Sequence, residues 1–282
     1  MTAPSPPKRR RPLLVRALRS IARQPRRLYT RHWLWHHGSF VISYPKSGRT
    51  WLRLMLASVL ASLTARPLTL DVHTYGDPGK GIPWVFFTHD GAGLSKAEAT
   101  AGDPHFYEGK TVLLLVRDPR DVVISHYHQV RRRKRDGPVV TDLDSFIRGP
   151  LGIDRIIAFM NRWAAQRSVP GRFALLRYEQ IHEDRLGALR SAVDFFGIRG
   201  VTEHVLAAAA ERGSFERMRA IEAGGLLDDR RLQPRNVDDP DSYKVRRGKI
   251  GSHADELTPA QVRFLDDRIR EALSPEFAYY VR

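Results

Sequence analysis

An apolar segment that runs directly into a basic, glycine-containing turn limits this chain more than any other feature of its sequence. Residues 40–44 (FVISY) are too apolar to have one face in water, and PKSGRT and the helical pattern of residues 50–63 follow at once. A buried strand, a tight turn and a helix start, in this order, place free backbone N–H groups and the positive end of a helix dipole around one point. We therefore expect a phosphate-binding site at this turn.

Four side chains of the turn suit a bound phosphate. Lys46 and Arg49 supply positive charge, and Ser47 and Thr50 supply hydroxyl groups. Compared with the nucleoside-triphosphate loop G-x-x-x-x-G-K-[ST], registered on Gly48, the first glycine is missing and arginine replaces lysine. The shorter loop predicts that a single phosphate is held rather than a β,γ pair.

The rest of the chain alternates short apolar segments with segments of helical period, which is typical of βαβ units and a parallel sheet. The predicted strands are residues 40–44, 84–88, 112–116 and 173–177. The predicted helices are residues 50–63, 120–130, 153–166, 185–196, 202–211 and 259–273. Residues 65–83 and 226–251 are expected to be irregular. We find no repeat and no linker that divides residues 39–282, so these residues are expected to form one α/β domain.

The charge is concentrated in the basic extension formed by residues 1–37. These residues carry one lysine, nine arginines and no acidic residue, which gives +10 of the net charge of +16 and leaves +6 for the rest. Two interpretations of the extension stay open: a solvated, partly disordered tail, or a basic amphipathic helix that lies on an anionic membrane or an acidic partner. The moderate charge of the remaining chain favours small anionic ligands and does not require a specific nucleic acid.

The amino-acid composition also excludes several classes of protein and site. The absence of cysteine excludes a disulfide scaffold, a thiolate zinc site and a thiol nucleophile. No apolar segment is long enough to span a bilayer, and arginines interrupt the N-terminal segment before it could serve as an export signal. We therefore expect a cytoplasmic protein, with contact to a membrane only through the extension.

Two further segments carry cations where an anion can bind. Arg117 follows the predicted strand 112–116, and open α/β sheets bind their ligands at the carboxyl ends of parallel strands. Ser125 lies one to two helical turns further on. Near the C-terminus, Arg246, Arg247 and Gly248 begin the segment RRGKIG, which can wrap N–H groups and guanidinium groups around a phosphate. Taken alone, Arg117 could merely form a salt bridge with Asp118 or Asp121 at a turn, and RRGKIG could be a solvated basic loop.

Together, the three segments resemble the nucleotide-binding signatures of the sulfotransferases that use 3′-phosphoadenosine 5′-phosphosulfate. The matching patterns are YPKSG-x-TW at residues 44–51, R-x-P-x-D-x-x-x-S at 117–125 and RRG-x-x-G at 246–251. The resemblance implies a P-loop-type, three-layer α/β domain over residues 38–282, with a central parallel β-sheet flanked by helices. It also implies an enzyme that transfers a sulfuryl group from this nucleotide, without a metal, to a hydroxyl or amine of a small-molecule, glycolipid or sugar acceptor.

By similarity to this family, residues 46–51 would hold the 5′-phosphosulfate, and Arg117 with Ser125 would hold the 3′-phosphate. Trp51, Tyr178 and Phe215 occupy positions that enclose adenine in the family. The residues expected to bind the nucleotide are Lys46, Ser47, Gly48, Arg49, Thr50, Trp51, Arg117, Ser125, Tyr178, Ser214, Phe215, Met218, Arg246, Arg247 and Gly248.

His89 is expected to be the catalytic base, with Lys46 as its catalytic partner. His89 follows the apolar segment 84–88, and the pair Thr88-His89 is similar to the family's catalytic site. An imidazole with an ordinary pKa near about 6.5 accepts a proton from a hydroxyl at neutral pH. Lys46 would stabilise the negative charge that builds on the leaving phosphate.

At two places the sequence differs from the usual pattern of the family. Phe87 stands where many members have a lysine, so a second sulfate-binding cation is either absent or supplied from elsewhere. The segment 254–263 lacks the Lys, Val and Glu of the family's short dimerisation motif, which leaves the oligomeric state open. We expect residues 65–83 and 131–150 to shape the acceptor pocket.

Two other functions stay open at this point. One is a P-loop kinase that uses ATP, with Asp90 or Asp118 as a magnesium ligand. The other is a non-enzymatic module that binds anionic lipid or nucleic acid through the extension and the basic residues 131–135.

Overall fold

The computed structural model describes residues 38–92, 103–133, 142–224, 227, 229–232, 243–245 and 248–281. Nearly all of them belong to a unit that begins at Ser39. The basic extension predicted for residues 1–37 lies outside the described residues, and so do Arg246, Arg247 and residues 134–141.

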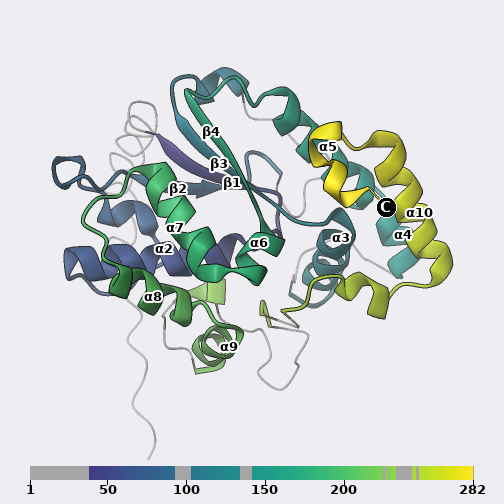
Figure 1. Cartoon of the computed structure of the whole chain (residues 1–282). Coiled ribbons are helices and arrows are strands. Elements are labelled where there is room, and N and C mark those ends of the chain that lie inside the picture. The colour runs from purple at the N-terminus through teal and green to yellow at the C-terminus, as the bar shows by residue number, and fades with distance from the viewer. Residues whose placement is uncertain are drawn as a thin grey trace, which may run out of the picture. The chain divides into compact units, whose positions relative to one another are not determined.

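Within the described residues, four parallel strands form the central sheet in the order β2-β1-β3-β4 (Figure 1). The strands are β1 (Ser39–Ser43), β2 (Val85–Thr88), β3 (Thr111–Val116) and β4 (Arg172–Arg177). The sequence prediction of these strands is confirmed to within one residue at each end. The central strand β1 is buried along its whole length, which explains its apolar sequence. Because Ile42 pairs with Thr88 on one side and Leu114 on the other, the strands end at the same edge of the sheet.

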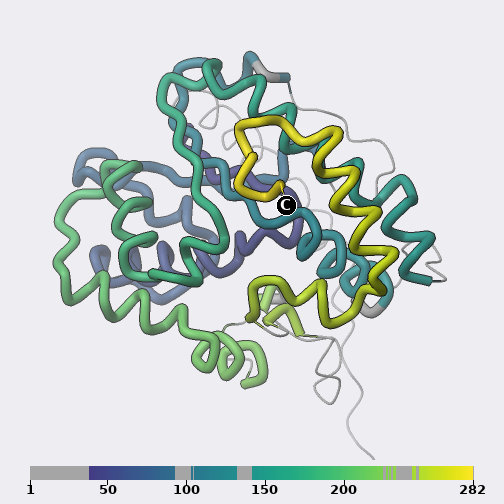
Figure 2. Tube along the Cα trace, turned by 45° about the vertical axis from the view of Figure 1, so that its right-hand side comes forward, coloured from purple at the N-terminus to yellow at the C-terminus, as the bar shows by residue number. Residues whose placement is uncertain are grey.

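Helices cover both faces of the sheet, which confirms the predicted three-layer arrangement. On one face, α2 (Arg49–Thr64), α7 (Arg185–Phe196) and α8 (Glu203–Arg212) share a core with inward side chains such as Val41 and Leu113. On the other face lie α3 (Pro119–His128) and α5 (Ile153–Ala165), and the Phe159 ring of α5 packs 5.6 Å from Tyr44. The C-terminal helix α10 (Pro259–Ala272) runs beside α5 (Figure 2).

The predicted helices are all present, and the structure adds short ones. Helix α3 ends earlier than predicted, at His128, and continues as the π-helix η4 (Gln129–Arg133). The helices that the sequence pattern missed are α4 (Leu143–Arg148), α6 (Tyr178–Glu183) and α9 (Phe215–Gly224). The irregular stretches contain the 3₁₀ helices η1 (Val72–Tyr75), η2 (Pro78–Lys80) and η5 (Arg230–Leu232). Elsewhere among the described residues, 3₁₀ helices occur at η3 (Pro104–Tyr107), η7 (Ser252–Asp255) and η8 (Pro275–Tyr280).

Candidate functional site

Each of the four strands delivers a predicted site residue directly after its carboxyl end. The phosphate turn follows β1, His89 follows β2, Arg117 follows β3 and Tyr178 follows β4. All of these line one cavity of about 370 Å³. The parallel register therefore brings together residues that are far apart in the sequence, as the positions of the strand ends predict.

The phosphate turn leaves the start of α2 available to a ligand. Gly48 is the N-cap residue, and no side chain among the described residues caps the first turn of this 16-residue helix. Gly48 has a φ of 90°, and a Cβ at this position would lie 2.6 Å from Cδ2 of Tyr178. Glycine is thus required both by the left-handed backbone and by the ring packed against it. Lys46 also lies in the left-handed region, with a φ of 77°, which is uncommon outside glycine.

The side chain of Lys46 reaches across the cavity to the π-helix. Its Nζ donates to Oε1 of Gln129, 3.2 Å away. Gln129 is the first residue of η4, and both side chains line the cavity. The π-helix therefore begins at a residue that contacts the predicted site. Single π turns are frequently found at functional sites.

His89 is held in one tautomer by the strand beside it. Its Nδ1 lies 2.8 Å from the backbone oxygen of Ser43. Because a carbonyl oxygen only accepts, Nδ1 carries the proton and Nε2 keeps its lone pair. Burial, together with the positive charge of Arg49 and then of Lys244, lowers the pKa of His89 to about 3. At neutral pH the imidazole is therefore uncharged and able to accept a proton.

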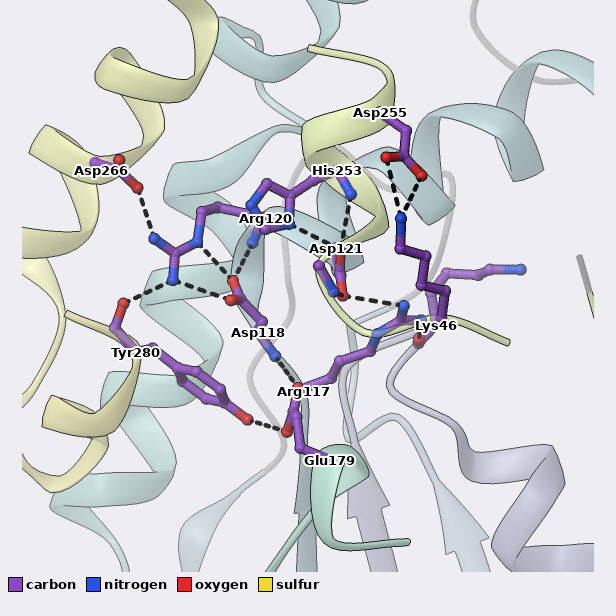
Figure 3. Close-up of polar contacts among 12 residues, drawn as sticks. Lys46, Arg117, Asp118, Arg120, Asp121, Glu179, His253, Asp255, Asp266 and Tyr280 are labelled. Atoms are coloured by element: carbon purple, nitrogen blue, oxygen red, sulfur yellow. Dashed lines mark hydrogen bonds and ion pairs between the residues drawn. The ribbon is translucent and has the colours of Figure 1, made fainter. Parts of the chain in front are cut away.

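Arg117 is fixed by an aromatic ring and by a buried carboxylate. Its guanidinium lies 4.2 Å above the ring of Tyr178, and Nη2 donates to Asp121 at 3.3 Å. Figure 3 shows Asp121 between Arg117 and His253. The Nε of Arg117 is buried and has no hydrogen-bond partner among the described residues. One donor of this cation is therefore left for a group that enters the cavity.

Asp121 also ties the C-terminal loop to α3. It accepts the N–H of Gly251 at 2.9 Å and the N–H of His253 at 3.0 Å. Burial alone would raise the pKa of Asp121, but the hydrogen bonds from His253 and the charge of Arg117 hold it below its usual range. A charged carboxylate thus joins two segments of the predicted site.

Aromatic rings form another part of the wall. Trp51 donates its Nε1 to the backbone oxygen of Gly213 at 2.6 Å and packs edge-on against Tyr178, with the centroids 5.3 Å apart. Phe215 is 37% exposed, which is unusual for so large an apolar side chain, and it lies against Gly248, where a Cβ would be 2.4 Å from its ring. These rings offer apolar faces to a flat, partly polar ligand.

The other predicted site residues that the structure describes differ in whether they reach the cavity. Thr50, Ser125 and Met218 line the cavity. Ser47 is buried and Ser214 accepts the N–H of Arg217 at the start of α9, and neither is among the lining residues.

Four cations of the cavity were not among the predicted site residues: Arg185, Arg231, Lys244 and Lys249. Only Lys249 could have been suspected, since it lies inside the basic segment RRGKIG. Arg231 and Lys244 belong to a stretch that has no periodic pattern. With Lys46, Arg49 and Arg117, seven cationic side chains line the cavity, and no aspartate or glutamate is among its described lining residues. Such a cavity attracts a ligand with several negative charges.

The two aspartates that a kinase would use for magnesium are engaged elsewhere. Asp90 accepts from the Tyr107 hydroxyl at 2.9 Å and from Arg162 at 2.6 Å. Asp118 accepts from Nε and Nη2 of Arg120, both at 2.9 Å. Neither lines the cavity, so the kinase hypothesis is not favoured.

In the part of the chain that the structure describes, no helix combines the length and the apolar character needed to cross a bilayer. Of the basic residues 131–135, Lys134 and Arg135 lie outside the described residues, and the Arg131 side chain donates to the Tyr127 hydroxyl at 3.0 Å.

The chain is similar to known sulfotransferases in sequence and in fold. The chain is 25% identical over 255 residues to cytosolic sulfotransferase 17 of Arabidopsis thaliana, covering 82% of this chain and 73% of that protein. It is 23% identical to sulfotransferase 2B1 of Rattus norvegicus, covering 83% and 70%. The fold matches that of mouse sulfotransferase SULT7A1 complexed with PAP, with a TM-score of 0.59, 22% identity and coverage of 86% and 85%. It also matches a retinol dehydratase in complex with androsterone and PAP, with a TM-score of 0.58, 17% identity and coverage of 86% and 84%.

The family model described as "Sulfotransferase domain" matches residues 37–275. This range contains all three nucleotide-binding signatures and every strand of the sheet. Because the match extends over most of the chain, the protein belongs to the sulfotransferase family.

Proposed function

We propose that this protein transfers a sulfuryl group from 3′-phosphoadenosine 5′-phosphosulfate to a hydroxyl or amine of an acceptor. The observation that carries the proposal is a cavity lined by seven cations and no described carboxylate, with a neutral histidine in its wall. The relatives are named sulfotransferases, and two of the matching structures contain PAP, the desulfated nucleotide. These findings support the same donor for this chain.

The residues of the cavity fit the two anionic ends of this donor. The uncapped start of α2, with Lys46, Arg49 and Thr50, would hold the 5′-phosphosulfate, because N–H groups at a helix start and nearby cations both favour phosphate. Arg117, whose Nε has no partner among the described residues, would hold the 3′-phosphate with Ser125.

The adenine would be held by the aromatic wall. Trp51 and Tyr178 pack against each other, and the partly exposed ring of Phe215 lines the same cavity. Gly248 lies against Phe215, and Met218, which also lines the cavity, belongs to a small apolar cluster against which Trp51 packs. A purine between aromatic faces is a favourable arrangement.

The transfer is an in-line displacement at sulfur. A bond forms between the acceptor's oxygen or nitrogen and the sulfur, and the bond between the sulfur and the bridging oxygen breaks. The electron pair of the broken bond leaves with the 5′-phosphate of PAP. The proton of the acceptor passes to Nε2 of His89. This nitrogen is unprotonated, because the proton of the neutral ring is on Nδ1, which donates it to the backbone oxygen of Ser43. Lys46 would stabilise the charge on the leaving oxygen.

The acceptor is expected to be a small molecule, and a glycolipid or a sugar belongs to the same proposal. Residues 38–282 would carry the activity as one domain in the cytoplasm. The basic extension, residues 1–37, would add contact with an anionic membrane.

Calorimetry with PAP and mass spectrometry of acceptor panels test this function. We expect PAP to bind the purified full chain with a measurable heat, and we expect products whose mass has increased by one sulfuryl group. Transfer should persist in EDTA, whereas a kinase would lose its activity. Absence of PAP binding would overturn the proposal.

A further inference from the structure

Asp90, the residue directly after His89, carries a buried carboxylate that the proposed reaction does not use. Its side chain is 5% exposed and is not among those that line the cavity. Arg162 on α5 donates to this carboxylate at 2.6 Å, and the hydroxyl of Tyr107 on η3 donates to it at 2.9 Å. Because a buried ion pair is costly to desolvate, stability is a weak explanation for it. Its place beside the proposed base therefore calls for another explanation.

The backbone turns sharply at Asp90, where β2 has just ended. Asp90 has a φ of 46° and Gly91 a φ of 79°, both in the left-handed region. The N–H of Ala92 donates to the backbone oxygen of His89 at 2.9 Å and closes the turn. A left-handed residue with a Cβ persists only where its surroundings hold it. Lys46 shares this conformation, so the backbone is strained at one proposed catalytic residue and next to the other.

Arg162 holds Asp90 by its backbone as well as by its side chain. Its Nη2 donates to the backbone oxygen of Asp90 at 3.1 Å and to Oδ2 at 2.6 Å. The guanidinium of Arg162 lies 5.4 Å from the centroid of the Phe159 ring, and the ring of Tyr107 packs edge-on against Trp163 with the centroids 5.1 Å apart. Burial and the charge of Asp90 raise the pKa of Tyr107, so its hydroxyl keeps the proton that it donates. The turn after β2 is thus anchored to α5 and η3.

Two separate contacts therefore determine where His89 lies. Its ring is bound to the backbone oxygen of Ser43 at the end of β1, and its backbone leads directly into the anchored Asp90. The first contact sets which ring nitrogen carries the proton, and the second sets the position of the residue at the end of β2. A general base acts only within hydrogen-bond reach of the proton, and a misplacement of about 1 Å can cost about 100-fold in rate.

We infer, on the basis of the proposed function, that Asp90 is a positioning residue for His89: it anchors the turn after β2 to Arg162 and Tyr107 and thereby keeps Nε2 of His89 directed at the acceptor's proton. Asp90 acts through His89 alone. Since neither Asp90 nor its two partners line the cavity, loss of the anchor should slow the transfer and leave the binding of PAP intact.

Asp90→Gly tests this inference, because glycine adopts the same backbone conformation without the carboxylate. We expect kcat for transfer to 4-nitrophenol to fall about 10- to 100-fold, while the Kd of PAP for the full chain changes by less than about 2-fold. Asp90→Asn keeps one acceptor oxygen and the tolerance of a positive φ, so it should recover part of this loss. Tyr107→Phe removes one donor and keeps the packed ring, and it should lower kcat by about 3-fold.

The NMR shifts of the two ring nitrogens of His89 give a readout that a loss of stability alone would not move. In the natural protein saturated with PAP, these shifts should show one tautomer, protonated at Nδ1. In Asp90→Gly the hydrogen bond to Ser43 should form only part of the time, so both shifts should move toward the average of the two tautomers. His89→Gln assigns the signals.

Asp266→Asn controls for the general effect of breaking an ion pair. Asp266 accepts from Arg120 at 2.6 Å, the same distance as in the pair of Asp90 and Arg162, and neither Asp266 nor Arg120 lines the cavity. This variant should leave kcat and the His89 shifts unchanged.

The outcomes separate this inference from the proposed function. If PAP binds and transfer occurs, but Asp90→Gly keeps its kcat or Asp266→Asn loses as much, the inference is wrong and the proposed function stands. If 4-nitrophenol is not an acceptor, the NMR shifts in the PAP complex decide, and a single unchanged tautomer in Asp90→Gly overturns the inference. If PAP itself does not bind, the proposed function fails and the inference falls with it.

Discussion

His253 donates twice to Asp121, through its backbone N–H at 3.0 Å and its Nδ1 at 2.9 Å, although 132 residues separate the two. The same carboxylate accepts from Arg117 at 3.3 Å. The C-terminal loop and the cation proposed to bind the 3′-phosphate are therefore held by one side chain.

Replacement of Asp121 by asparagine should weaken both the fold and the site. Asp121→Asn removes a buried charge beside Arg117, so we expect the free energy of unfolding to fall by about 3 kcal/mol. PAP should bind about 10-fold more weakly, because Arg117 loses its fixed position. Urea denaturation and calorimetry measure the two effects.

The matched control is Asp144→Asn, which breaks an exposed ion pair with Arg148. It should change stability by less than about 0.5 kcal/mol. Equal stability of the two variants would contradict the proposed role of Asp121.

Gly48→Ala should destabilise the folded protein by more than the left-handed backbone conformation of residue 48 alone accounts for. A left-handed residue with a Cβ costs about 1 kcal/mol, and here the Cβ would also meet the Tyr178 ring at 2.6 Å. We expect a loss of about 2–4 kcal/mol in stability and weaker PAP binding. Gly109→Ala is the control, since Gly109 has a φ of 68° with no atom within 4 Å of the added Cβ, and it should cost only about 1 kcal/mol. Similar losses in both variants would exclude a contribution from the ring.

The protonation of His89 should not change in the neutral range. Since its pKa is lowered to about 3, its NMR signal should stay constant between pH 5 and 8. His105 provides an internal contrast, because the hydrogen bond that its ring donates to the Glu108 carboxylate raises its pKa above the usual value. His89→Gln and His105→Gln assign the signals. A His89 signal that titrates near pH 6.5 would show that the imidazole is not neutralised by its surroundings.

The same pKa makes stability depend on pH with a definite sign. The folded pKa of His89 lies below the unfolded value near about 6.5, so the unfolded chain binds more protons between these two values. The contribution of the neutral imidazole to stability is thus complete above pH 6.5 and is lost as the pH falls toward 3. Between pH 7 and 4, His89→Gln should lose less unfolding free energy than the natural protein.

Lys46→Ala should affect the chemical step more than the binding of the nucleotide. A cation at a developing negative charge contributes about 10²–10³ in kcat, whereas the helix start and Arg49 still hold the phosphate. We expect single-turnover rates to fall by that factor and PAP affinity to fall by less than about 10-fold. Equal losses in binding and rate would mean that Lys46 only anchors the ligand.

The parts of the fold that depend on local pattern could be predicted from the sequence. The inner strands β1 and β3 are buried on both faces and read as continuous apolar segments, and the phosphate turn has its own residue types. Because parallel strands end at one edge, the proximity of His89, Arg117 and the turn followed from the strand assignments alone.

The remainder depends on contacts between distant segments. Arg231 and Lys244 reach the cavity from a stretch without period, so no local pattern indicates them. The six residues of α6 are too few to show a helical period, and Ser47 is buried in the turn, beside Lys46 in its left-handed conformation. The positions of these residues depend on tertiary contacts rather than on residue type.

Because residues at all four strand ends line the cavity, the nucleotide can bind only when the whole sheet is folded. A ligand that contacts every strand end has affinity only for the native state and shifts the unfolding equilibrium by RT ln(1 + [L]/Kd). Excess PAP should therefore raise the melting temperature of the whole domain in one cooperative transition, and a variant in which any one strand has shifted its register should lose this thermal protection entirely.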